Sequence, residues 1–220
     1  MEGGGGVKLR LSRVHHPVTA LGPGTRIGIW TKGCAIACPG CASRDTWDAD
    51  EQDEVDVADV LAWCATTDPT LVTGVTITGG EPSEQPEALT ALVTGLDAFR
   101  CDHDWDVLCY TGVEHDEFAA RCPDVPGLID ALVTGPYRAG RPTDLVWRGS
   151  ANQRLIPLGE RGHDRYQRWV DARSDRPSLQ LHVEDDRVWL IGVPRAGDLA
   201  RLQRTLGRRG IALEGPSWRP

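Results

Sequence analysis

Apolar residues in the middle of the chain follow a regular order that predicts strands alternating with helices. Short β-branched runs predict strands, and apolar residues that recur every three or four positions predict helices. The predicted strands cover 26–31, 74–78, 106–110 and 131–133, and the predicted helices cover 55–66, 89–99 (with Ser83 as a possible N-cap) and 114–121. This alternation is typical of βα units, so the chain is predicted to have an α/β fold with a parallel sheet.

The two ends of the chain depart from this pattern. Residues 1–24 are rich in glycine and proline and predict a loose segment, in which we expect the pair His15-His16 to be exposed rather than ligating. Residues 138–177 show no clear periodicity.

The pattern becomes regular again near the C-terminus. Alternation over 179–183 and 188–191 predicts a hairpin, and leucines at helical spacing predict a helix after it. The hairpin and the helix together cover about 178–208. We therefore expect a core over 25–158 and a C-terminal extension over 159–220, which covers a sheet edge or the bottom of the core.

Length, charge and cysteine content narrow the class of protein. The 220 residues fit one domain, with or without a small appendage. The net charge of −8 argues against nucleic acid or an anionic membrane as partner. No apolar run approaches the roughly 18 residues of a membrane span, and the start shows no secretory signal. Seven cysteines, an odd number, favour a reducing cytoplasm over a disulfide framework.

Three of these cysteines lie in one short segment after the first predicted strand. Cys34, Cys38 and Cys41 have C-x3-C-x2-C spacing, and no fourth cysteine continues the pattern. A four-iron cluster held by three thiolates leaves one iron open, which is what chemistry at the cluster requires. A zinc site completed by a distant His or Cys, and plain structural cysteines, are the alternatives. The four other cysteines are Cys64, Cys101, Cys109 and Cys122, and their spacing is not that of ligands in one compact site. We expect Cys64 and Cys109 to be small buried side chains.

Each predicted core strand ends in a loop that contains glycine. The loops contain Gly33, Gly79-Gly80, Gly112 and Gly135. In parallel α/β folds ligands lie outside the carboxyl ends of the strands. We therefore expect the cysteine loop and the other three loops to form one site.

These motifs resemble the radical S-adenosylmethionine enzymes, and within them the activases of glycyl radical enzymes, especially of anaerobic ribonucleotide reductase. The resemblance covers roughly residues 25–155, and the matching segments are 33–41, 46–47, 78–82, 110–112, 130–137 and 147–153. It implies a partial, open (β/α) barrel of the TIM type. It also implies a [4Fe-4S] cluster on Cys34, Cys38 and Cys41, with S-adenosylmethionine chelating the open iron.

The resemblance also implies which residues contact the cofactor. The backbone at Gly40 would contact the adenine, and the turn after the second strand would accept from the methionine ammonium, with Glu81 supporting that charge or holding the turn. Trp47 would shield the cluster. The cofactor-binding candidates are Gly40, Thr78, Gly79, Gly80, Glu81, Pro82, Tyr110, Thr111, Thr134, Ser150 and Asn152. No catalytic side chain beyond the cluster and the cofactor is expected.

The implied activity is reductive cleavage of S-adenosylmethionine to a 5′-deoxyadenosyl radical, which takes hydrogen from a glycine of a large glycyl radical enzyme or from another protein or peptide. A flavodoxin- or ferredoxin-like protein would supply the electron, with Arg44 as one candidate contact. Two alternatives stay open: a radical enzyme that modifies a peptide or small molecule, such as a deazapurine synthase, and a non-catalytic iron–sulfur electron carrier.

Overall fold

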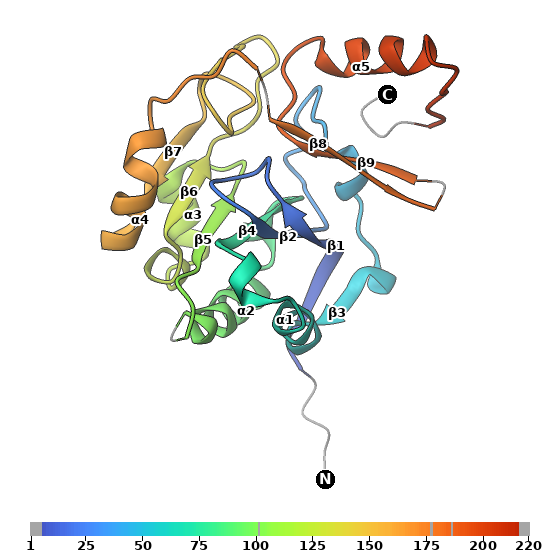
Figure 1. Cartoon of the computed structure of the whole chain (residues 1–220). Coiled ribbons are helices and arrows are strands. Elements are labelled where there is room, and N and C mark those ends of the chain that lie inside the picture. The colour runs from blue at the N-terminus through green and yellow to red at the C-terminus, as the bar shows by residue number, and fades with distance from the viewer. Residues whose placement is uncertain (1–5, 101, 177, 186, 216–220) are drawn as a thin grey trace.

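A computed structural model describes residues 6–100, 102–176, 178–185 and 187–215 of the chain. In this part a seven-stranded mixed sheet has the order β3-β1-β2-β4-β5-β6-β7, and a separate hairpin pairs β8 with β9 (Figure 1). The strands are β1 (Lys8–Val18), β2 (Arg26–Thr31), β3 (Glu54–Asp56), β4 (Gly74–Gly79), β5 (Asp106–Tyr110), β6 (Ala131–Thr134), β7 (Arg154–Pro157), β8 (Leu179–Glu184) and β9 (Arg187–Gly192). The helices are α1 (Val57–Ala65), α2 (Pro86–Phe99), α3 (His115–Arg121), α4 (Gly159–Tyr166) and α5 (Asp198–Gly207).

The α/β prediction is confirmed, but the sheet is not purely parallel. Strands β2, β4, β5 and β6 pair in parallel, whereas β1, β3 and β7 pair antiparallel at the two sides. The described strands do not close into a barrel, because β3 and β7 end the sheet without pairing to each other. The carboxyl ends of the four parallel strands therefore share one open edge, as predicted.

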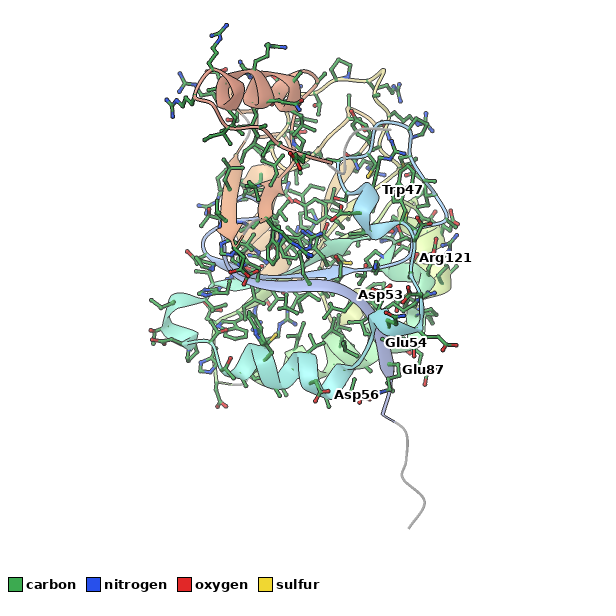
Figure 2. The ribbon with its side chains drawn as sticks, turned by 90° about the vertical axis from the view of Figure 1, so that its right-hand side faces the viewer. Trp47, Asp53, Glu54, Asp56, Glu87 and Arg121 are labelled. Atoms are coloured by element: carbon green, nitrogen blue, oxygen red, sulfur yellow. The ribbon has the colours of Figure 1, made fainter. Side chains whose placement is uncertain are left out.

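The sheet has different neighbours on its two faces. One face packs against α1, α2 and α3 in the main apolar core, which includes Ile29, Ile77, Leu92 and Phe118. In Figure 2 the helices α1 and α2 lie below the sheet, and the hairpin and α5 lie above it. The parallel strands are apolar on both sides because both sides are covered, which explains their continuous β-branched runs.

Three expectations about local structure were wrong. Residues 8–18 form strand β1 rather than a loose segment, since β1 pairs with both β2 and β3. His15 lies in β1 and is only 9% exposed. Ser83 does not cap α2, because it lies in the short 3-10 turn Pro82–Glu84 and the helix begins one residue after Gln85.

The region without periodicity contains regular elements. Strand β7 and helix α4 lie there, and Tyr166 at the end of α4 is fully buried against β5 and β6. The predicted hairpin and final helix are confirmed as β8, β9 and α5. No helix in the described part of the chain is long and apolar enough to cross a bilayer.

A buried ion pair fixes the strand ends opposite the glycine loops. Arg26 of β2 is fully buried and donates to Asp106 of β5 at 2.6 Å and to Thr76 of β4 at 2.6 Å. Burial alone would raise the pKa of Asp106, but the Arg26 cation and further hydrogen bonds hold it below its ordinary value. One guanidinium thus joins three parallel strands.

Candidate functional site

The loop after β2 carries the three cysteines of the motif and is fixed to the following segment. The backbone N–H of Gly33 donates to the carbonyl of Thr46 at 2.8 Å, and that of Cys34 donates to the carbonyl of Trp47 at 2.9 Å. These two bonds join the start of the loop to the residues that follow its last cysteine. The loop is therefore closed on itself.

A carboxylate that the sequence did not single out holds the same loop from the other side. Glu84 Oε1 accepts the backbone N–H of Ala35 at 2.8 Å. Its neighbour Gln85 donates to the carbonyls of Arg10 and Lys32, each at 3.2 Å. Nothing in the local sequence marks these side chains, because their partners lie about fifty or more positions away.

The three thiols are free and half-buried. Burial raises the pKa of the Cys34 thiol, and hydrogen bonds from nearby loop backbone act against that rise. Burial also raises the pKa of Cys38, with a backbone hydrogen bond from Tyr137 acting in the opposite direction. The backbone N–H of Ser43 donates to Cys41 Sγ at 3.4 Å. Backbone donors that point at sulfur stabilise thiolate, the form that binds iron.

The spacing of these sulfurs fits a cluster better than a single ion. Among the described residues, no three His, Cys, Asp or Glu side chains come close enough together to share one metal ion. A four-iron cluster instead gives each thiolate its own iron and so accepts a wider separation. Three soft thiolates in one loop fit an open iron–sulfur cluster.

The glycine turn at the end of β4 lies directly against the cysteine loop. A Cβ on Gly80 would lie 2.3 Å from the carbonyl oxygen of Gly33, which no side chain tolerates. Gly79 has φ +105°, in the left-handed region that favours glycine. The backbone N–H of Glu81 donates to the Gly33 carbonyl at 2.8 Å. The glycine pair is required because the two backbones touch.

The Glu81 side chain joins the ends of β4 and β5. It is 1% exposed. Its Oε1 accepts the Thr111 hydroxyl at 2.7 Å, and its Oε2 accepts the Gly112 N–H at 2.6 Å. It also accepts the Ser83 N–H at 3.0 Å. These bonds account for holding the turn, the second of the two roles expected for Glu81.

Three predicted contact residues have buried polar atoms without a partner. These atoms are Tyr110 Oη, Thr134 Oγ1 and Asn152 Oδ1. They lie at the ends of β5 and β6 and just before β7. An unpaired buried polar atom is costly, so a polar ligand at this edge would relieve that cost. This observation fits a cofactor rich in hydrogen-bonding groups.

The other predicted residues support the loops instead. The fully buried Ser150 accepts the Arg138 N–H at 3.1 Å. Pro82 is buried at the start of its 3-10 turn. Gln153, which the sequence did not single out, accepts the Gly149 N–H at 2.8 Å and donates to the Gly135 carbonyl at 3.0 Å.

A cavity of about 1270 Å³ opens beside the cysteine loop. Four residues expected at the site line it: Gly40, Cys41, Thr78 and Tyr110. The remaining expected residues lie around the site without lining this cavity. Its opposite side is formed by β8, β9 and α5.

Trp47 lies beside the loop and above a row of acidic side chains, among them Asp53 and Asp56 (Figure 2). The Arg44 guanidinium lies 5.0 Å from the centre of the Trp47 ring.

The expected burial of Cys64 and Cys109 is confirmed, and Cys122 is buried too. Cys101 lies outside the described residues.

Comparison with known proteins identifies related sequences. The family model described as "4Fe-4S single cluster domain" matches residues 20–156. A protein from Salmonella typhi is 32% identical over 153 residues, which cover 63% of this chain and 93% of the relative. A protein from Escherichia coli K12 is 29% identical, and the match covers 63% of this chain and 93% of the relative. A protein from phage T4 is also 29% identical, and the match covers 61% of this chain and 85% of the relative. All three are named anaerobic ribonucleoside-triphosphate reductase-activating protein.

Proposed function

This chain belongs to the 4Fe-4S single cluster domain family, and we propose that it is a radical S-adenosylmethionine enzyme that activates a glycyl radical enzyme. The observation that carries the proposal is the fixed three-cysteine loop, which adjoins buried polar atoms without partners. An electron carrier with a closed cluster would need a fourth protein ligand. It would have no use for buried polar atoms without partners beside the cluster.

Cys34, Cys38 and Cys41 would hold the cluster, and the fourth iron would take the amino and carboxylate groups of the methionine. The carbonyls of the β4 turn at Thr78 and Gly79 would accept from the ammonium. Tyr110, Thr134 and Asn152 would supply the unpaired buried atoms to the cofactor. Gly40, which lines the cavity, would present backbone to the adenine. Glu81, Pro82, Thr111 and Ser150 would position these groups through the bonds described above.

When bound, the reduced cluster and S-adenosylmethionine supply a carbon-centred oxidant that takes hydrogen from the substrate. The contribution of the chain is to orient the cofactor and to exclude water. Glu81 would help to orient the cofactor, because it fixes the β4 turn relative to β5. Trp47, which lies next to Arg44, would shield the cluster.

We also propose the partners and the setting. The hydrogen donor would be a glycine of an anaerobic ribonucleotide reductase, by analogy with the names of the relatives. The electron donor would be a flavodoxin- or ferredoxin-like protein. Free thiols among the described cysteines support a reducing, cytoplasmic setting. The open sheet would be the partial barrel of the radical enzymes, and the family match to residue 156 supports a core that ends near 158.

The function is tested with anaerobically reconstituted protein. With dithionite and S-adenosylmethionine, wild-type protein should form 5′-deoxyadenosine, and with an anaerobic ribonucleotide reductase it should give a glycyl radical signal in electron paramagnetic resonance. Cys38→Ala should lose both products, whereas Cys64→Ala, which changes a buried cysteine of α1, should keep both. Wild-type protein without 5′-deoxyadenosine would refute the radical enzyme, and 5′-deoxyadenosine without a glycyl radical would refute the activase.

A radical enzyme that modifies a peptide is the second candidate. The observation that favours it is the part of the chain after residue 156, which lies outside the family match and supplies cavity-lining residues between 181 and 215. This candidate predicts 5′-deoxyadenosine formation with a peptide as hydrogen donor and no glycyl radical on a reductase.

A further inference from the structure

The cavity beside the cysteine loop has two chemically different walls. The wall from the core carries polar groups, among them Ser43, Thr78 and Tyr110. The wall from the extension is mostly apolar, and its lining side chains include Leu181, Val188, Leu190, Val193, Leu199 and Leu202. The polar wall is the one that contains the proposed cofactor contacts, so the apolar wall faces whatever enters beside the cofactor.

The hairpin is fixed on the sheet, so this wall has a defined position. Ile191 of β9 is 3% exposed and packs in one cluster with Val18, Leu21 and Trp30. Gln180 of β8 donates to the Pro17 carbonyl at 2.7 Å and accepts the Thr19 N–H at 3.0 Å.

Helix α5 forms the outer part of the wall. Leu199, Leu202 and Leu206 line the cavity, while Arg201 and Arg204 are exposed on other sides of the helix. Because its leucines face the cavity, α5 does not present a free apolar face to a membrane.

We propose that residues 179–185 and 187–213 form a substrate-selecting wall, and that its occupant is an extended polypeptide segment with apolar side chains next to the residue that gives up hydrogen. The inference rests on the proposed function and adds to it the class of sequence that is recognised. The reacting Cα–H bond breaks homolytically, its hydrogen atom moves to the 5′ carbon of the cleaved cofactor, and one unpaired electron stays on the polypeptide.

The chemistry of the wall favours a polypeptide with apolar side chains over a small polar metabolite. The charged residues of the wall are Asp185, Arg187, Arg195 and Glu214, and apolar side chains make up most of its remaining lining. Arg195 is already engaged, because it donates to the carbonyls of Ser174 and Asp175. Apolar side chains that flank a backbone glycine match such a surface.

Two synthetic peptides test the inference. Both carry one glycine deuterated at Cα, flanked by leucine and valine in one peptide and by serines in the other. With reconstituted wild-type enzyme and dithionite, deuterium should appear in 5′-deoxyadenosine, with kcat/KM at least tenfold higher for the apolar peptide. That ratio corresponds to about 1.4 kcal/mol. Leu202→Ser should reduce the ratio about tenfold.

Two further variants control for misfolding of the extension. Ala200→Ser changes an exposed residue of α5 that does not line the cavity, and it should keep the wild-type ratio. Leu202→Phe keeps the wall apolar and narrows it. It should therefore keep the preference for a peptide with apolar residues beside the glycine, but favour alanine over leucine at these flanking positions.

The outcomes separate this inference from the function beneath it. Equal kcat/KM for both peptides in the wild type, or the same ratio in Leu202→Ser as in the wild type, would overturn the selecting wall while 5′-deoxyadenosine still forms. If the wild type forms no 5′-deoxyadenosine in any arm, the proposed function fails and the inference fails with it.

Discussion

Polar side chains around the cysteine loop serve either to hold backbone or to face the open edge. Glu81 and Glu84 hold the backbone in place, because their carboxylates accept N–H groups of neighbouring loops. Tyr110, Thr134 and Asn152, at the ends of β5 and β6 and just before β7, have buried polar atoms that lack partners. Substitutions in the first group should change the geometry of the cluster, and substitutions in the second should change cofactor binding alone.

Gly80→Ala should weaken the cluster. The added Cβ would meet the Gly33 carbonyl at 2.3 Å, so the β4 turn or the cysteine loop has to move. We expect less than half of the wild-type iron per chain after anaerobic reconstitution, measured by colorimetric iron assay. Gly127→Ala is the control, because a Cβ there meets nothing within 4 Å. Equal iron in Gly80→Ala and wild type would contradict the required close approach.

At the scale of elements, the site depends on parallel strands that are joined at both ends. Glu81 joins β4 to β5 at the carboxyl ends, and Arg26 joins β2, β4 and β5 at the other ends. Two buried charged groups therefore set the relative positions of three strands. The loops they carry move only if these contacts break.

Asp106→Asn should destabilise the fold strongly. It leaves Arg26 buried without its counter-charge, which typically costs about 3–5 kcal/mol. Asp104→Asn removes a carboxylate that is 84% exposed and pairs with Arg165, and an exposed pair contributes about 1 kcal/mol at most. Urea unfolding of both variants measures the difference. Similar losses in the two variants would contradict the role of the buried pair.

The contact between the hairpin and β1 should depend on pH. The His15 and His182 rings have their centres 4.2 Å apart and are tilted by 48° to each other. His15 also lies near Trp189, and the Arg13 guanidinium lies over the Trp189 ring. Burial, followed by His182 and His16, lowers the pKa of His15, and Glu184 acts in the opposite direction. The folded state therefore disfavours protonated His15. Its contribution to stability is full above the ordinary histidine pKa of about 6.5 and is lost as pH falls.

Thermal unfolding between pH 7.5 and 5 checks this dependence. Wild type should lose more stability on acidification than His15→Asn, which lacks the titrating ring. His163→Asn alters an exposed histidine of α4 and should behave like wild type. If wild type and His15→Asn lose stability in parallel, His15 does not control the hairpin contact.

At the scale of the whole molecule, local patterns predicted the central elements and long-range pairing decided the rest. Strands β2, β4, β5 and β6 were predictable because each is a compact apolar run. Strand β1 was not, since its sequence Lys8–Val18 is mixed and becomes a strand only by pairing with β2 and β3.

The same distinction applies to the site. Cys34, Cys38 and Cys41, the proposed cluster ligands, could be found from their spacing because all three lie in one loop. Glu84 and Gln153 could not, because each acts on backbone that only the fold brings near. The apolar wall was out of reach for the same reason, since it forms where the extension meets the core.

The proposed open iron is tested most directly by electron–nuclear double resonance on the reduced cluster with S-adenosylmethionine labelled with 15N at the methionine amino group. We expect a 15N coupling in wild type and in Cys64→Ala, because the amino group would bind the iron that lacks a cysteine. A reduced four-iron cluster that shows no 15N coupling with saturating cofactor would contradict it.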